Sequence, residues 1–136
     1  MGKVLDGKAI AERIKGELVQ ELRRLGIVPQ LRILYFETPA SRVYWQAQNR
    51  VAAELGIGTG TGATEERGSV ACPWDVTPAR AEQIIDRWNR DPEVHGIFVH
   101  QPMPPQIDPG RISSLIDPRK DVEGIHPQNS ARRFFA

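Results

Sequence analysis

Residues 38–50 read TPASRVYWQAQNR, and this stretch decides the fold. A nearly continuous apolar run, residues 31–36, precedes it, and a helical pattern leads from it to residue 55. Pro39 has a preset φ angle and no N–H, which suits a first helical turn, and Thr38 is a suitable N-cap. The stretch therefore predicts a buried strand that passes directly into a helix.

This predicted helix carries two side chains suited to a ligand crevice. Tyr44 and Gln48 are four residues apart, so they are neighbours on one helix face. In an open α/β sheet, ligands bind beyond the carboxyl ends of the strands, which is where this helix begins. The alternative interpretation is an amphipathic helix in which Tyr44 is a half-buried core aromatic.

Composition restricts the class of protein. The 136 residues are the size of one domain, with 40% hydrophobic and 26% charged residues. A formal net charge of +1 argues against a nucleic acid as partner. The single cysteine, Cys72, excludes an internal disulfide and makes a reducing cytoplasm the expected compartment. We expect no signal peptide, no membrane span and no metal site, because His95 and His126 lack metal-ligand spacing with each other or with Cys72.

Apolar periodicity predicts alternating helices and strands. Helices are expected over residues 7–25, 39–55 and 78–88, with a short helix within residues 107–117, and strands over residues 31–36, 69–74 and 94–100. The predicted buried stripe of the third helix is Ala81, Ile84, Ile85 and Trp88. This alternation favours an α/β fold of one domain, with three α/β/α layers around a mostly parallel sheet. The glycine-rich residues 57–68 read either as a flexible loop or weak strand, or as a phosphate loop that lacks the usual Lys-Ser/Thr pair.

Polar residues follow both convincing strands. Ser41, Tyr44 and Gln48 come after the first strand, and His100 and Gln101 come after the second. A polar, turn-rich segment around Asp121 and Glu123 lies further along the chain. Because carboxyl ends of parallel strands share one edge of a sheet, we expect these residues to converge on one crevice.

Three motifs together resemble a known family. They are PAS at 39–41 followed by Tyr44, GIFVHQPMP at 96–104 and KDVEGIHP at 120–127, and LDGK at 5–8 also fits. This set is similar to the bifunctional methylenetetrahydrofolate dehydrogenase/methenyltetrahydrofolate cyclohydrolase family. The resemblance implies a catalytic domain over residues 1–127, which takes a tetrahydrofolate derivative as substrate, and a C-terminal tail over 128–136.

The resemblance also implies what a longer relative would add. Family members carry a Rossmann domain for NAD(P), and no GxGxxG unit occurs in this sequence, so a separate domain or chain would have to supply that site. A C-terminal helix of the family returns to this domain. Without it, we expect a homo-oligomer or a partner chain to cover the open face. The sequence is either a natural stand-alone domain or a fragment.

Three positions depart from the family pattern. Gln48 stands where the family has a catalytic Lys, His100 where it has Gln, and Glu123 where it has Asp. The resemblance makes Gln48 and His100 the catalytic positions. Six residues are then expected to bind substrate: Ser41, Tyr44, Gln101, Pro102, Asp121 and Glu123.

The changes suggest a hypothesis about proton transfer. An amide at Gln48 cannot titrate, whereas the imidazole of His100 has an ordinary pKa of about 6.5. If the two positions face each other, His100 is a relocated proton shuttle that Gln48 orients. The alternative is a degenerate site in which His100 is only a polar residue at a strand end. In function, the first reading is an enzyme of one-carbon folate metabolism, and the alternative is a non-catalytic folate-binding or protein-interaction module.

Overall fold

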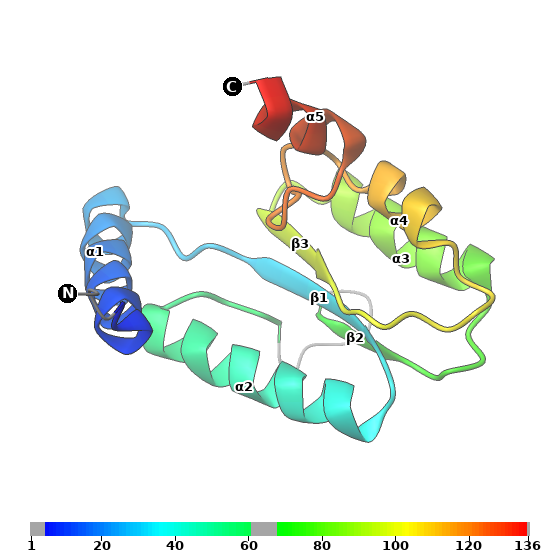
Figure 1. Ribbon diagram of the computed structural model, residues 1–136, viewed down its shortest axis with the longest axis horizontal. Coiled ribbons are helices and arrows are strands. Elements are labelled where there is room, and N and C mark those ends of the chain that lie inside the picture. The colour runs from blue at the N-terminus through cyan, green and yellow to red at the C-terminus, as the bar shows by residue number, and fades with distance from the viewer. Residues whose placement is uncertain (1–4, 61–67, 136) are drawn as a thin grey trace.

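The computed structural model describes residues 5–60 and 68–135, with side chains to residue 132. Eight elements follow one another along these ranges (Figure 1). In chain order they are α1 (Gly7–Leu25), β1 (Leu31–Phe36), α2 (Pro39–Leu55), β2 (Val70–Cys72), α3 (Pro78–Arg90), β3 (Gly96–Val99), α4 (Pro109–Leu115) and α5 (Pro127–Phe135).

The sheet has three parallel strands in the order β2-β1-β3. Leu34 of the central strand β1 pairs with Val70 on one side and with Val99 on the other. α2 covers one face of the sheet, and α3 and α4 cover the opposite face (Figure 1). The predicted α/β fold with a parallel sheet between helical layers is confirmed.

The core lies between the sheet and α3. Leu34 and Phe36 are completely buried, because alternate residues of β1 face that side. The stripe predicted for α3 faces them, with Ile84 and Ile85 completely buried and Trp88 only 1% exposed. Burial of this kind stabilises by roughly 1.5–3 kcal/mol for each large apolar side chain.

Local signals placed the start of α2 correctly. The Thr38 hydroxyl accepts from the Ser41 N–H at 3.1 Å, and the Ser41 hydroxyl accepts from the Thr38 N–H at 2.9 Å. This is a reciprocal capping box, with Pro39 in the first turn. Gly56 ends the helix at φ 75°, a left-handed conformation that glycine adopts without strain.

The apolar stripe of α1 remains open. α1 lies against the C-terminal end of α2, where Lys15 pairs with Glu54 at 3.6 Å. None of its residues is buried, and Ile10, Ile14 and Leu18 are each more than two-fifths exposed. The periodicity therefore predicted the helix correctly, but the described part of the chain does not bury the stripe.

Three predicted elements differ from the structure. β2 and β3 are shorter than the predicted ranges 69–74 and 94–100, and residues 127–135 form α5 where the sequence predicted only a tail. The glycine-rich stretch 57–68, considered as a phosphate loop, falls largely outside the described residues. In the parts of the chain that the structure describes, no helix is long and apolar enough to cross a membrane.

Candidate functional site

The centre of the candidate site joins α2 to the end of β3. The Gln48 side-chain oxygen Oε1 lies 2.5 Å from the imidazole Nε2 of His100, across 52 residues of sequence. Gln48 points from the third turn of α2, and His100 follows directly after β3. The expectation that these two positions face each other is confirmed.

The imidazole of His100 is buried among three aromatic rings. Its residue is only 1% exposed, and its ring lies 4.9 Å from that of Tyr44, 5.5 Å from that of Phe98 and 5.8 Å from that of Tyr35. Burial lowers the pKa of His100, because a charged imidazole loses hydration there. The ring is thus held in its neutral form near pH 7, with its Nδ1 buried and unpartnered among the described residues.

An apolar cavity of about 330 Å³ opens beside this pair. Tyr44 and Gln48 line one part of it, and the rest is aliphatic: Leu31, Ala47, Val51, Ala52, Leu55 and Ile57. The Tyr44 residue is 52% exposed and lines the cavity. Its ring also contacts those of Phe98 and His100, so the half-buried aromatic of the alternative interpretation is compatible with the structure as well. The lining of the cavity is aliphatic over most of its extent, with polar groups only at Tyr44 and Gln48.

Ser41 lies near this centre but serves the backbone. Its hydroxyl donates to the carbonyl of Phe36 at 2.5 Å and accepts from the Thr38 N–H. The residue is 8% exposed. Its hydroxyl therefore fixes the turn from β1 into α2, which sets the direction in which Tyr44 and Gln48 project.

Gln101 and Pro102 form the exposed rim of the candidate site, directly after His100. Both are exposed, and the peptide bond between them is cis. Pro104 is buried two residues later, and Met103 packs against the core, which anchors the segment. The structure thus brings Gln101 and Pro102 to the same end of the sheet as His100.

The Asp121 carboxylate organises its own loop. One oxygen accepts from the Gly124 N–H at 2.9 Å, and the other accepts from the His126 N–H and the Asn129 side chain, both at 2.9 Å. Burial would raise the pKa of Asp121, but these hydrogen bonds outweigh it, and the pKa is lowered. The hydrogen bonds from His126 and Asn129 also hold the start of α5 against this loop. The sequence pattern did not predict α5.

Glu123 lies against the outer edge of β3, the edge that does not pair with β1. Its carboxylate accepts a hydrogen bond from the backbone N–H of Val99. Burial and the neighbouring charge of Asp121 raise its pKa, and the Val99 hydrogen bond opposes them. Residues 120–121 run parallel to β3, with Asp121 bridged to Ile97, so Glu123 continues this edge pairing with a side chain.

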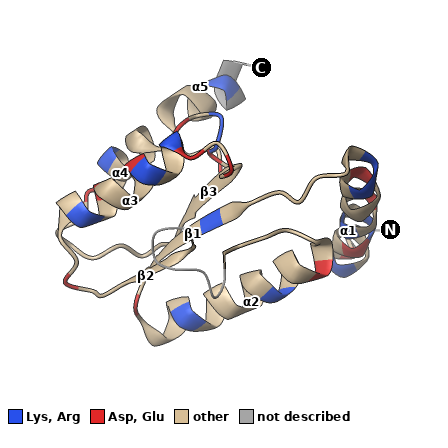
Figure 2. Cartoon of the chain, turned by 180° about the vertical axis from the view of Figure 1, so that it is seen from behind, with Lys and Arg blue, Asp and Glu red and all other residues tan. Residues whose placement is uncertain are grey.

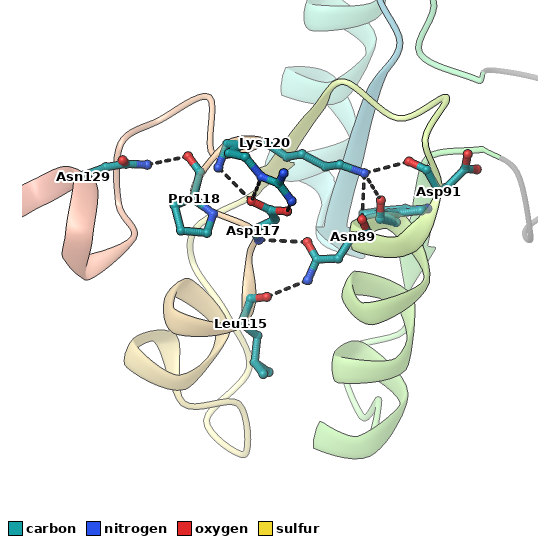
Figure 3. Close-up of polar contacts among 9 residues, drawn as sticks. Asn89, Asp91, Leu115, Asp117, Pro118, Lys120 and Asn129 are labelled. Carbon is teal, nitrogen blue, oxygen red and sulfur yellow. Dashed lines mark hydrogen bonds and ion pairs between the residues drawn. The ribbon is translucent and has the colours of Figure 1, made fainter.

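Sequence reasoning missed the anchor of this loop, which is Lys120 (Figure 3). Its ammonium donates to the carbonyls of Trp88 and Asn89 at 2.8 Å each and of Asp91 at 2.6 Å, at the end of α3. The Asn89 side chain continues the contact, since it donates to Leu115 O at 2.6 Å and accepts from Asp117 N at 2.8 Å. The only sequence signal was a lysine directly before Asp121.

The charged side chains outside this site are dispersed over the surface. Lys and Arg are spread over α1, α2, α3 and α4 (Figure 2). Within residues 5–60 and 68–135, no group of three His, Cys, Asp or Glu side chains is placed to hold a metal ion. Cys72 is buried.

Comparison with known proteins identifies the class of domain. The family described as tetrahydrofolate dehydrogenase/cyclohydrolase, catalytic domain, matches residues 5–123. The chain is 37% identical over 136 residues to the bifunctional protein FolD of Geotalea daltonii and 43% identical over 129 residues to that of Heliobacterium modesticaldum. It belongs to this family, and the match lies in the family's catalytic domain.

Solved structures agree with this assignment. The FolD methylenetetrahydrofolate dehydrogenase/cyclohydrolase of Campylobacter jejuni superposes with a TM-score of 0.82 at 32% identity, over 95% of this chain and 44% of that one. The Trypanosoma brucei enzyme, solved with NADP and an inhibitor, gives 0.83 at 30% identity, over 96% and 43%. The two curated relatives are likewise covered over only 46% and 42% of their length, by 97% and 92% of this chain. The chain thus spans less than half the length of the relatives it matches.

Proposed function

We propose that this domain binds a tetrahydrofolate derivative and acts in one-carbon folate metabolism, as a methylenetetrahydrofolate dehydrogenase/methenyltetrahydrofolate cyclohydrolase domain. The observation that carries the proposal is the meeting of Tyr44, Gln48 and His100 beside an apolar cavity in a member of that family. A folate fits this setting by its chemistry, since it combines flat rings with a polar edge.

In this proposal, six residues make or shape the binding site. The Tyr44 ring stacks on a flat part of the ligand, and the Glu123 carboxylate accepts from its amino and ring N–H groups. Gln101 and Pro102 form the rim. Ser41 and Asp121 contribute through the backbone that they hold.

Gln48 and His100 form the chemical end of the proposed site. Gln48 lines the cavity and contacts the one-carbon unit. His100 is the titratable member of the pair, because the amide of Gln48 neither gains nor loses a proton near neutral pH. The 2.5 Å contact between them supports a joint role.

Hydride transfer would require NAD(P), bound at a site outside residues 1–136. The chain spans 46% of the Geotalea daltonii relative and forms one three-stranded domain. We therefore propose that a separate domain or chain supplies the binding site for the nicotinamide cofactor. We also propose that the protein acts in the cytoplasm. Adding a nicotinamide-binding chain should then be required for any oxidation of methylenetetrahydrofolate.

A partner would also cover the open apolar surface. The exposed stripe of α1 leaves Ile10, Ile14 and Leu18 in water. We propose that a second copy or a partner chain buries them. A molar mass that stays that of a monomer at all concentrations in light scattering would contradict self-association.

Calorimetric titration with tetrahydrofolate and with methenyltetrahydrofolate tests the binding function. We expect saturable micromolar binding that Tyr44→Ala weakens at least tenfold, because the stacking wall is removed. Trp74→Ala, at an exposed aromatic outside the site, is the matched control. Binding without turnover would favour a non-catalytic folate-binding module, and no binding at millimolar ligand would refute the proposal.

A further inference from the structure

A polar cavity lies at the opposite end of the sheet from His100. It has a volume of about 250 Å³ and lies at the amino ends of the parallel strands β1 and β3. Six residues line it: Val28, Gln30, Arg32, Pro92, Glu93 and His95. Tyr44 and Gln48 are not among them, so this cavity is separate from the candidate site.

Arg32 brings a buried positive charge to this cavity. The residue is only 7% exposed, and its Nη1 donates to Gln30 Oε1 at 3.2 Å and to the carbonyl of Leu31 at 3.1 Å. Both of these acceptors are neutral, and Nε is buried with no hydrogen-bond partner among the described residues. Burial lowers the pKa of Arg32, and the charge of Asp91 only partly opposes it. A carboxylate from a ligand would therefore be a stronger partner than any that the guanidinium has now.

Contacts around Gln30 hold the lining in place. Its side chain lies against Gly58, where an added Cβ would come within 2.5 Å of Gln30 Nε2, so the missing side chain leaves the space that Gln30 fills. The Gln30 backbone N–H donates to His95 Nδ1 at 2.9 Å. The proton of a neutral His95 ring is therefore on Nε2, which gives the same lining a second donor.

Glu93 adds the opposite charge to the lining. It is exposed and follows Asp91 by two residues. A simple anion at Arg32 would be repelled by these carboxylates, and a simple cation at Glu93 would be repelled by the guanidinium. A ligand that carries a carboxylate and an ammonium close together meets both charges favourably. Val28 and Pro92 supply apolar walls for the rest of such a ligand.

We propose that this cavity binds a small aliphatic α-amino acid, whose carboxylate accepts from Arg32 and His95 and whose ammonium lies against Glu93. The two charges of an α-amino acid are separated by a single carbon atom, which suits a cavity of this size that has both countercharges in its lining. The inference does not depend on the proposed folate function, because none of these residues lines the cavity beside Gln48.

NMR titration of the nitrogen-15-labelled chain with L-valine tests the site. We expect saturable shifts of the Gln30, Arg32 and His95 amide signals, with a Kd in the millimolar range. Two matched ligands divide the recognition: 3-methylbutanoate is valine without its ammonium, and 2-methylpropylamine is valine without its carboxylate. Each should bind at least about tenfold more weakly than valine, because it loses one charge-assisted contact and meets the remaining like charge.

Two substitutions assign the two charges. Glu93→Gln should weaken valine binding and strengthen 3-methylbutanoate binding, so that the two ligands bind alike, because the repelling carboxylate is gone. Arg32→Met should abolish the binding of both ligands. Arg13→Met is the matched control, because Arg13 is exposed on α1, and it should leave all affinities unchanged.

Four results would overturn the proposal. They are no saturable binding of valine, equal affinities for valine and the two matched ligands, unchanged valine affinity in Glu93→Gln or in a folded Arg32→Met, and valine shifts confined to residues around Gln48. Glu93→Gln changes an exposed side chain, so it decides the question even where Arg32→Met does not fold. Each of these results leaves the proposed folate binding unchanged, which the folate titrations test by themselves.

Discussion

Replacement of Lys120 by methionine tests the anchor beneath the candidate site. Methionine keeps the length and flexibility of the stem but removes the ammonium. The change deletes three hydrogen bonds, to the carbonyls of Trp88, Asn89 and Asp91 at 2.6–2.8 Å. These carbonyls lie at the end of α3, where the helix itself offers them no donor. Lys120 therefore joins the loop of Asp121 and Glu123 to that helix.

The expected loss is moderate. Hydrogen bonds from a charged donor contribute roughly 1.5–3 kcal/mol each. Part of that gain is already offset in the wild type by the lost hydration of the ammonium, which also lowers the pKa of Lys120. Water can hydrogen-bond some of the freed carbonyls. We therefore expect a net loss of about 2 kcal/mol in the free energy of unfolding, and a fall in Tm of about 8 °C for a domain of this size.

Urea denaturation followed by circular dichroism measures the loss. Lys8→Met is the matched control, because Lys8 is exposed in the first turn of α1. It should change the free energy of unfolding by less than about 0.5 kcal/mol, as most surface substitutions do. Folate affinity should fall in Lys120→Met, because the loop carrying Glu123 loses its attachment. A Lys120→Met protein as stable as the control would refute the reasoning.

Three further changes have defined outcomes. Ser41→Ala should lower the free energy of unfolding by about 1–2 kcal/mol in urea titrations, since it breaks the capping box, whereas Ser113→Ala on α4 should have little effect. Ile85→Ala should cost about 2–5 kcal/mol by the same measurement, because its side chain is completely buried. The hydrogen bond from Arg119 lowers the pKa of Asp117 to about 2. Its ionised form therefore stabilises the fold fully above about pH 4, the unfolded value, and this contribution is lost as the pH falls toward 2. Asp117→Asn should accordingly flatten the fall of the urea midpoint over that range, and an unchanged slope would contradict the assignment.

Short-range signals predicted most of the fold. The Thr38-Pro39 pair fixed the start of α2, and the stripe ending at Trp88 fixed the buried face of α3, because capping and periodicity depend on neighbours in sequence. The meeting of Gln48 and His100 was also predictable. Two parallel strands end at one edge of a sheet, so the residues that follow them converge.

Contacts made by long side chains to distant backbone could not be predicted in the same way. Lys120 reaches three carbonyls about thirty residues away, and Glu123 reaches the N–H of Val99. No local pattern encodes such partners, since they depend on how the loop lies against α3 and β3. For the same reason the sequence did not reveal α5, which begins where Asp121 accepts from His126 and Asn129.

The departures from the family pattern complement one another. If the site had only decayed, a buried imidazole would stand where the resemblance implies a Gln, with nothing to receive its N–H, at the cost of an unsatisfied polar group. Instead, the amide at Gln48 accepts that N–H at 2.5 Å. The Glu123 carboxylate likewise has a partner at the edge of β3, where it accepts from Val99. Each substitution thus has a partner within the site. Reverting one alone should therefore do more harm than reverting both. Gln48→Lys would place an ammonium against the neutral ring of His100, whereas the double variant Gln48→Lys/His100→Gln would restore the pair that the resemblance implies for the family. We expect the single variant to bind methenyltetrahydrofolate more weakly than the double variant, and equal affinities in calorimetric titration would show that the two positions act independently.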